Sequence, residues 1–476
     1  MTTTLPPNVY VDLDGTLIAT DLLHESVLKL LRASPLDALR LPAWLMRGKA
    51  YMKQQIAQRV SFDWALLPYR PEVLDLVRRA RGQGRRVVLA TASDESFAAA
   101  VARHLGLFDA VLASDGSTNL SGRRKLDAIR ADAAGQPFCY VGDGFVDLAV
   151  WSGAASAVVV SNSAALGRRV RESTPIEAEI GLPKARLRDY LYGIRLHQWL
   201  KNLLVFVPLL PILRSATPSM DVSELWMFIT FGLCASSIYV FNDLLDLEAD
   251  RQHRRKRNRP FASGVIPIAH AMLIGLSLLL FGVAWAFLAL PMPAALMLLG
   301  YLALTTVYSL WLKRKMLLDV FALASLYTVR ILAGAAAIEV EFSFWILAFS
   351  IFIFLSLALA KRYVEIDELK GGGRSSIKGR TYSSGDGLFV LAAGVTAGEI
   401  SILTISLYMN DPLIALKYRH PHILWGLCPL LLYWIVRIWM KAYRNELHDD
   451  PVVFTAKDHV SQLIVIASVL LVYGAS

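Results

Sequence analysis

The chain has 476 residues, 55% of them hydrophobic, and a formal net charge of +10 at pH 7. The mean hydropathy of +0.46 is typical of a membrane protein, and the apolar residues are concentrated after residue 200. Because the basic residues cluster beside apolar segments, an anionic membrane surface or phosphorylated substrates explain the charge better than nucleic acid does. The three cysteines share no metal-like spacing, which argues against a disulfide framework or a cysteine metal site.

The N-terminal part predicts an α/β domain. A short apolar strand begins at Asn8 and runs directly into Asp12 and Asp14, and residues 21–80 predict a helical insertion. Three further strands are predicted at Arg85–Ala90, Asp109–Ala113 and Phe138–Val141. Strands that alternate with helices favour a parallel sheet, whose chemistry gathers at the C-terminal ends of its strands. The first residues have neither the basic nor the apolar region of a signal peptide, so we expect this domain in the cytosol.

The five residues from Asp12 to Thr16 read Asp-Leu-Asp-Gly-Thr. They resemble the first motif of the haloacid-dehalogenase superfamily of phosphatases, and the resemblance covers about residues 6–170. It implies a Rossmann-like fold in which the helical insertion forms a small cap over the site. The implied roles are a nucleophile (Asp12), a general acid/base (Asp14), phosphoryl-binding groups (Thr91 and Lys125) and Mg²⁺ ligands or acidic supports (Asp12, Asp14, Asp143 and Asp147).

The chemistry of these side chains agrees with the resemblance. A carboxylate such as Asp12 can attack phosphorus and form an aspartyl-phosphate. The carboxyl group of Asp14, two residues on, can protonate the leaving alcohol and then activate water. Mg²⁺ and Lys125 can neutralise the charge that develops on the phosphoryl oxygens.

After this domain, predicted for residues 1–175, we expect a linker and an interfacial amphipathic helix at 176–199 and a membrane domain at 200–476. Lys201 lies at the start of the membrane domain. Its ammonium group can bind a phosphate or extend to the membrane interface, and the sequence leaves both readings open.

Nine apolar segments predict an all-α, polytopic membrane bundle of about nine helices. They lie at about 200–213, 225–244, 268–290, 293–312, 318–338, 343–361, 387–408, 421–440 and 460–475. The loops at 251–259, 313–315 and 361–380 are strongly basic, whereas the intervening connections are not. The positive-inside rule therefore predicts a multi-pass protein of a bacterial inner membrane, with the N-terminal domain and both sites facing the cytoplasm.

The apolar run Leu225–Val240 leads into a row of acidic and amide side chains. Asn242, Asp246 and Asp250 are spaced by four residues, so that one helix would stack them on one face, with Asp243 at its flank. Carboxylates at this depth need a partner, and Mg²⁺ prefers oxygen ligands. We call these four residues the acidic ladder. A basic run follows, in which Arg257 and Arg259 suit phosphate oxygens.

The ladder and the following basic run, which ends in Arg-Pro-x-x-Ser-Gly, resemble the first signature of the UbiA-type membrane prenyltransferases. Within that superfamily, the sequence is most similar to the decaprenyl-phosphate 5-phosphoribosyltransferase branch, over about residues 186–476. The Gln-Trp-Leu-Lys-Asn segment that ends at Asn202 resembles the same branch. The resemblance implies Asp243 and Asp246 as catalytic residues and Asn242, Asp246 and Asp250 as Mg²⁺ ligands.

A second polar cluster comprises Tyr308, Lys313, Asp319, Tyr327 and Arg330, and the last four are predicted to bind substrate. Asp319 and Arg330 are eleven residues apart, about three helical turns, and so share a helix face. Aromatic prenyltransferases have a second Asp-x-x-x-Asp motif at this place, whereas this chain has Leu323 at its last position. Arg330 supplies a phosphate-binding cation instead, or it forms an intramembrane salt bridge with Asp319.

These observations predict a bifunctional enzyme. The membrane domain would transfer 5-phosphoribosyl from phosphoribosyl diphosphate to polyprenyl phosphate, and the soluble domain would remove the ribose 5-phosphate. The alternatives are a quinone-type aromatic prenyltransferase with an unrelated phosphatase, and a transporter or lipid-binding protein with a regulatory domain. The expected cofactor is Mg²⁺, the expected partners are the two substrates and membrane lipid, and homo-oligomerisation is left open.

Overall fold

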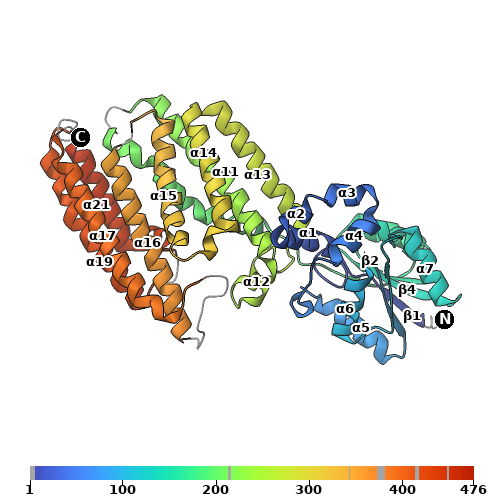
Figure 1. The fold of residues 1–476 in the computed structure, drawn as a ribbon. Coiled ribbons are helices and arrows are strands. Elements are labelled where there is room, and N and C mark those ends of the chain that lie inside the picture. Colours follow the sequence, from blue (N-terminus) through green and yellow to red (C-terminus); the bar gives the residue numbers. More distant parts are fainter. Residues whose placement is uncertain (1–5, 213–215, 342, 372–380, 413–417, 448–449) are drawn as a thin grey trace. The chain divides into compact units, whose positions relative to one another are not determined.

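The computed structural model describes residues 6–212, 216–341, 343–371, 381–412, 418–447 and 450–476 (Figure 1). The chain forms two compact units. The first comprises Met1–Gly193 and Val240–Ile274, and the second comprises Ile194–Tyr239 and Gly275–Ser476.

A six-stranded sheet forms the centre of the first unit, with the strand order β3-β2-β1-β4-β5-β6 and every neighbouring pair parallel. The strands are β1 (Asn8–Val11), β2 (Arg86–Asp94), β3 (Ala110–Ser114), β4 (Phe138–Gly142), β5 (Ser156–Val160) and β6 (Ile176–Ile180). The four strands predicted from sequence are β1 to β4. The sequence reading missed β5 and β6, and β6 lies in the segment predicted as a linker.

Alternation along β1 divides the apolar side chains between two cores. Val9 and Val11 pack on one face with residues of two helices, and Tyr10 packs on the other face with residues of three. The first face is covered by α5 (Pro71–Gly82) and α6 (Glu95–Leu105), and the second by α7 (Arg123–Ala133), α8 (Leu148–Trp151) and α9 (Ala164–Ser173). This is the predicted α/β fold with helices on both faces of a parallel sheet.

The predicted helical insertion forms a small cap after β1. It consists of α1 (Leu22–Ala33), α2 (Pro35–Ala38), α3 (Leu41–Met46), α4 (Lys49–Ala57) and the 3₁₀ helix η1 (Trp64–Leu66). Leu30, Ala38, Trp44 and Ile56 form a separate apolar core within it. The cap is thus a small packed layer of its own and not an extended loop.

The first unit also contains α10 (Leu187–Gly193), the end of α11 (Pro218–Leu245), α12 (Leu247–Gln252) and η4 (Lys256–Asn258). Asp246 separates α11 from α12, with φ −103° and ψ 13°. The prediction that one continuous helix carries the acidic ladder is therefore wrong. The ladder lies on two helices, α11 and α12, which are joined at Asp246.

The second unit is a helical bundle. Its elements are η3 (Leu196–Ile212), α11, α13 (Ile268–Ala289), α14 (Met292–Leu310), η5 (Leu312–Arg314), α15 (Leu318–Ala337), α16 (Phe344–Gly371), η6 (Ser384–Asp386), α17 (Gly387–Asn410), η7 (Pro421–Gly426), α19 (Leu427–Tyr443), α20 (Pro451–Lys457) and α21 (His459–Ala475). Figure 1 shows α16, α17 and α19 running side by side, and these three helices contact one another.

Seven described helices are long and apolar enough to cross a membrane, and α20 with α21, bent by 86°, can form an eighth span. The predicted count of nine is higher because the segment at 200–213 is not among these described helices. Residues 200–212 belong to the 17-residue 3₁₀ helix η3, which contains Pro208 and Pro211. The basic loop predicted at 361–380 lies partly outside the described residues.

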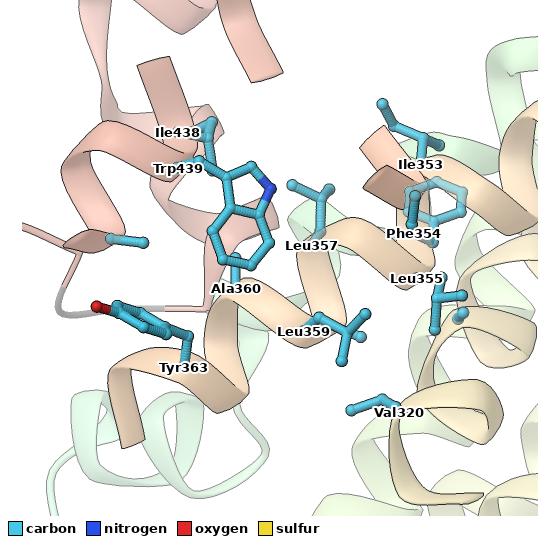
Figure 2. Close-up of a cluster of buried hydrophobic side chains, with 14 of the residues drawn as sticks. Val320, Ile353, Phe354, Leu355, Leu357, Leu359, Ala360, Tyr363, Ile438 and Trp439 are labelled. Atoms are coloured by element: carbon cyan, nitrogen blue, oxygen red, sulfur yellow. The ribbon is translucent and has the colours of Figure 1, made fainter. Parts of the chain in front are cut away.

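The largest apolar cluster of the bundle joins α16 to α15 and α19, whose residues Figure 2 labels. Val390 and Ala397 of α17 belong to the same cluster. Trp439 of α19 donates its indole N–H to Oγ of Ser356 on α16 at 2.9 Å. A Cβ at Gly394 of α17 would lie only 2.1 Å from this indole ring. The absence of a side chain at Gly394 therefore lets α17 approach the other two helices closely.

Candidate functional site

The first site lies at the C-terminal edge of the parallel sheet. Asp12 directly follows β1, and Lys125 of α7 places its Nζ 3.0 Å from Oδ1 of Asp12. The same Nζ lies 3.7 Å from Oδ1 of Asp147 and donates to Oη of Tyr140 at 3.0 Å. Tyr140 in turn donates to Asp147 at 2.7 Å. The sequence predicted Asp12, Lys125 and Asp147 for this site, but not Tyr140, which orients two of them.

Three carboxylates of this edge form a group suited to a metal ion. Oxygen atoms of Asp12, Asp143 and Asp147 all lie within 4.8 Å of one another. Lys125 is the only basic side chain paired with them among the described residues. One ammonium group cannot neutralise three carboxylates, and an all-oxygen donor set suits a hard divalent cation such as Mg²⁺. The residues present therefore fit the expected ion.

Asp14 was also predicted as a metal ligand, but among the described residues its carboxylate is not part of the group formed by Asp12, Asp143 and Asp147. Its Oδ2 accepts a hydrogen bond from the hydroxyl group of Ser93 at 2.5 Å, and its Oδ1 accepts from the backbone N–H of Leu22 at 2.8 Å. This position, held by the core strand β2 and the cap helix α1, leaves Asp14 suited to proton transfer.

The backbone around the first motif allows close packing of the acidic groups. Gly15 has a φ of +74°, and a Cβ there would lie 2.3 Å from Oδ2 of Asp143. Thr16 donates its hydroxyl proton to Oδ1 of Asp143 at 3.0 Å. Thr91, predicted to bind phosphoryl, is fully buried in β2, and its Oγ1 accepts from the backbone N–H of Ser93 at 3.0 Å. The structure therefore brings all the predicted motifs to one edge of the sheet.

Burial changes the proton affinity of these groups. It raises the pKa of Asp12 to about 6, although the Lys125 charge opposes the shift. It raises the pKa of Asp14 and of Asp143 to about 7. For Lys125, burial favours the neutral form, but the charges of Asp12 and Asp147 outweigh this effect and raise its pKa. A group with a pKa near 7 can both give and accept a proton at neutral pH, as a general acid/base requires.

The acidic ladder, in the same compact unit, is neutralised by guanidinium groups. Arg259 places Nη1 3.1 Å from Oδ1 of Asp243 and 2.6 Å from Oδ2 of Asp250. Nη1 of Arg32 lies 2.8 Å from Oδ1 of Asp246. Asn242 is half-buried at the end of α11. Among the described residues, the ladder carboxylates do not assemble into a group like that at Asp12.

A second site lies in the helical bundle, where two lysines share one carboxylate. Nζ of Lys201 lies 2.9 Å from Oδ2 of Asp450, and Nζ of Lys361 lies 3.0 Å from the same oxygen. Tyr327 donates its hydroxyl proton to Oδ1 of Asp450 at 2.9 Å. The sequence predicted Lys201 and Tyr327 for this site and missed Lys361 and Asp450. Lys361 ends a long apolar run, where a basic residue resembles an ordinary topology signal.

Arg330 of α15 is buried near this cluster without a carboxylate partner among the described residues. It is 3% exposed, and its Nε donates to Oδ1 of Asn202 at 3.1 Å while Nη2 donates to Oη of Tyr301 at 3.1 Å. Rings of Phe231, Tyr301 and Tyr327 surround its guanidinium at centroid distances of 5.2, 4.8 and 5.6 Å. Nδ2 of Asn202 is also buried, without a hydrogen-bond partner among the described residues. Buried donors of this kind suit an anion.

Asp319 does not pair with Arg330, although both lie on α15. Instead, Nη2 of Arg362 lies 2.8 Å from Oδ2 of Asp319, and Tyr382 donates to Oδ1 of Asp319 at 2.7 Å. The salt-bridge reading of Arg330 is therefore wrong, because Arg362 already neutralises Asp319. The sequence reading did not single out Arg362.

The remaining predicted cations lie on short helical turns. Lys313 is half-buried on η5, and Arg257 is exposed on η4. None of the described contacts joins Lys313 or Arg257 to the cluster around Lys201.

Comparisons with known proteins identify both halves of the chain. Residues 205–461 match the UbiA prenyltransferase family, and residues 9–151 match the haloacid dehalogenase-like hydrolases. The uncharacterized protein y4nM of Sinorhizobium fredii is 39% identical over 457 residues, covering 95% of this chain and 88% of its own. The relationship therefore includes both halves.

The decaprenyl-phosphate phosphoribosyltransferase of Mycobacterium tuberculosis is 34% identical over 210 residues, covering 43% of this chain and 69% of its own. Among solved structures, a UbiA homologue from Archaeoglobus fulgidus bound to DMAPP and Mg²⁺ is 18% identical, with a TM-score of 0.46, over 60% of this chain and 99% of its own.

Proposed function

This chain belongs to the UbiA prenyltransferase family and carries an N-terminal haloacid dehalogenase-like domain, and from that premise we propose a two-step synthesis of a lipid-linked ribose. The membrane domain transfers 5-phosphoribosyl from phosphoribosyl diphosphate to the phosphate of a polyprenyl phosphate. The soluble domain then removes the 5-phosphate. The product is a polyprenyl-phosphoryl ribose.

The observation that carries this proposal is the buried cation Arg330 beside the two lysines. Lys201 and Lys361 share the carboxylate of Asp450, and Arg330 bonds to Asn202 without a carboxylate partner among the described residues, so three cations lie in this part of the bundle with one paired carboxylate. A donor with three phosphate groups carries the negative charge that such a site needs. The mycobacterial relative, whose name specifies a phosphoribosyl transfer to decaprenyl phosphate, supports the same assignment.

The transfer breaks the bond between ribose C1 and the diphosphate oxygen and forms a bond between C1 and a lipid phosphate oxygen. Lys201, Lys361 and Arg330 hold phosphate oxygens of the donor and orient C1 toward the lipid phosphate. Asn242, Asp243, Asp246 and Asp250 of the ladder would be the residues to hold Mg²⁺, which would supply charge neutralisation for a leaving diphosphate. In the structure, Arg259 and Arg32 pair with the three carboxylates of the ladder.

The phosphatase step uses the residues at the edge of the sheet. Asp12 attacks phosphorus while Asp14 gives its proton to the departing O5 of ribose. Asp14 then takes a proton from the water that hydrolyses the aspartyl-phosphate, which restores both carboxyl groups. Lys125 holds a phosphoryl oxygen and keeps Asp12 ionised. Mg²⁺ held by Asp12, Asp143 and Asp147 would supply further neutralisation of the phosphoryl charge.

The helical bundle makes this an integral membrane protein. We further propose a bacterial inner membrane, with the basic loops and both sites on the cytoplasmic side, because basic residues flank the same ends of successive apolar segments. In this arrangement the product of the first reaction is formed on the side where the phosphatase acts.

The test is mass spectrometry of lipids from membranes that contain the full-length protein and are supplied with Mg²⁺, phosphoribosyl diphosphate and polyprenyl phosphate. We expect polyprenyl-phosphoryl ribose from the wild type and neither lipid product from Asp246→Asn. Turnover of a polyprenyl diphosphate with an aromatic acid, while phosphoribosyl diphosphate is ignored, would reject the proposal in favour of a quinone-type prenyltransferase.

A further inference from the structure

A lysine of the cap reaches the edge of the phosphatase site. Lys53 lies on α4, and its Nζ donates to the backbone carbonyl of Ala92 at 2.6 Å and to Oδ1 of Asn119 at 2.8 Å. Ala92 lies between Thr91, assigned to phosphoryl binding, and Ser93, whose hydroxyl group holds Asp14. The ammonium group of Lys53 is thus fixed beside the segment of β2 that forms the site.

The hydrogen bonds described for this ammonium group go to uncharged oxygen atoms. Lys53 is half-buried, and no ion pair to it occurs in the part of the chain that the structure describes. Burial lowers its pKa, whereas the charges of Asp14 and Asp21 act in the opposite direction. An ammonium group has three protons, and the two described hydrogen bonds leave one for a ligand.

Arg70 adds a second cation, beside the turn that follows Asp14. Its Nε donates to the backbone carbonyl of Gly15 at 3.1 Å, and the charge of Asp143 acts on its guanidinium. Among the described residues, Arg70 also has no ion-pair partner. The cap and its return to the core therefore add two positive charges to the edge of a site whose own phosphoryl-binding cation is Lys125.

We infer that Lys53 forms a second anion subsite, through which the phosphatase selects a sugar phosphate that carries another phosphate group, over a sugar monophosphate. The inference rests on the proposed function and narrows its substrate class. The lipid-linked intermediate has such a group, since its C1 phosphodiester is charged and its C5 phosphate is the one removed. If Lys53 only held the cap to the core, its replacement would lower the activity with all substrates alike.

The experiment compares two soluble probes with the full-length protein in detergent. One is ribose 5-phosphate with a methyl phosphodiester at C1, and the other is methyl riboside 5-phosphate, which lacks the second phosphate. Each has a single monoester, so the released phosphate reports on C5 alone. We expect the wild type to favour the diester probe in kcat/KM, and Lys53→Gln to lower this preference by about tenfold, mainly through KM. Lys53→Arg should restore part of the preference.

The matched control is Lys49→Gln, which removes the same charge from an exposed position one turn earlier on α4. It should keep the wild-type preference. Equal losses with both probes in Lys53→Gln, or a wild type that does not distinguish the probes, would overturn the inference. If the preference is present but membranes form no ribosylated lipid, the subsite stands and the proposed membrane reaction fails.

Discussion

Lys201 and Lys361 direct their ammonium groups to the same oxygen atom, with Nζ 2.9 and 3.0 Å from Oδ2 of Asp450. Two like charges this close are stable in a buried site only when an anion lies between them. Asp450 supplies that anion from within the chain. In the proposed transfer, a phosphate of the donor would take part of the same role, and the carboxylate and the substrate would then act on one set of cations.

This arrangement predicts that Asp450→Asn lowers the melting temperature of the purified protein when no anion is present. The substitution leaves the buried ammonium group of Lys201 and the half-buried one of Lys361 without this counter-charge. An uncompensated buried charge typically costs about 3 kcal/mol or more. Added diphosphate should recover part of the loss, because it neutralises the same cations. Thermal unfolding in detergent, with and without diphosphate, measures both effects.

The control for this variant is Glu446→Gln, which breaks an exposed ion pair with Lys441 and should change stability by less than about 1 kcal/mol. If Asp450→Asn melts with the wild type, or if diphosphate stabilises both proteins equally, Asp450 is not the counter-charge of the two lysines.

Arg330→Gln should reduce transfer of phosphoribosyl to lipid by at least about a hundredfold, because a buried charge-assisted contact with phosphate is lost. Arg330→Lys should fall between this variant and the wild type. It keeps the charge but cannot donate to both Asn202 and Tyr301. Incorporation of radiolabelled phosphoribosyl diphosphate into lipid is the measurement. The control Arg314→Gln changes an exposed position and should retain activity. A fully active Arg330→Gln variant would show that Arg330 is not part of the substrate site.

Asp12→Asn should abolish phosphate release and leave the membrane reaction intact, since only the nucleophile of the soluble domain is lost. Mass spectrometry should then detect accumulation of the phosphorylated ribosyl lipid. Asp127→Asn, on the exposed side of α7, serves as the control and should yield the dephosphorylated product. Phosphate release that persists in Asp12→Asn would contradict the assignment of the nucleophile.

The metal-free soluble domain should lose stability as the pH rises from about 4 to about 7. In the folded protein the pKa of Asp143 is raised from 3.8 to about 7, mainly by burial. The folded state therefore holds a proton that the unfolded state releases in this interval, and its advantage disappears as that proton dissociates. Thermal unfolding in EDTA, followed from pH 4 to pH 8, measures this loss.

Asp143→Asn should reduce the loss with pH and raise the melting temperature in EDTA, because one of three crowded carboxylates becomes neutral. The same variant should abolish the stabilisation that Mg²⁺ gives to the wild type. A pH profile unchanged by the substitution would show that Asp143 is not the group responsible.

Much of the soluble site could be predicted from the sequence, because its motifs follow strands, and the carboxyl ends of parallel strands meet at one edge. Asp12, Thr91 and Asp143 were placed by this rule alone. Tyr140 could not be found in this way, since it lies inside β4 and reads as a core residue. The strand β5 was missed because the helices beside it, α8 and α9, are short or strongly basic. The strand β6 was missed because its residues were assigned to the linker predicted at 176–199.

The bundle was less predictable for a physical reason. Helix periodicity shows which residues of one helix share a face, but it does not show which helix lies opposite. Asp319 and Arg330 do share α15, yet each pairs with side chains from other elements, Arg362 and Asn202. Asp450 is 89 residues from Lys361 along the chain, and nothing in the local pattern of either residue indicates the contact.

The 3₁₀ winding of η3 increases the distance that its 17 residues extend. As an α-helix, its 17 residues would extend about 26 Å, less than the roughly 30 Å of a hydrocarbon core. With the rise of about 2.0 Å per residue of a 3₁₀ helix, the same residues extend about 34 Å. The tighter winding therefore stretches the segment that carries Lys201 and Asn202, although η3 is not among the described helices long and apolar enough to cross a membrane.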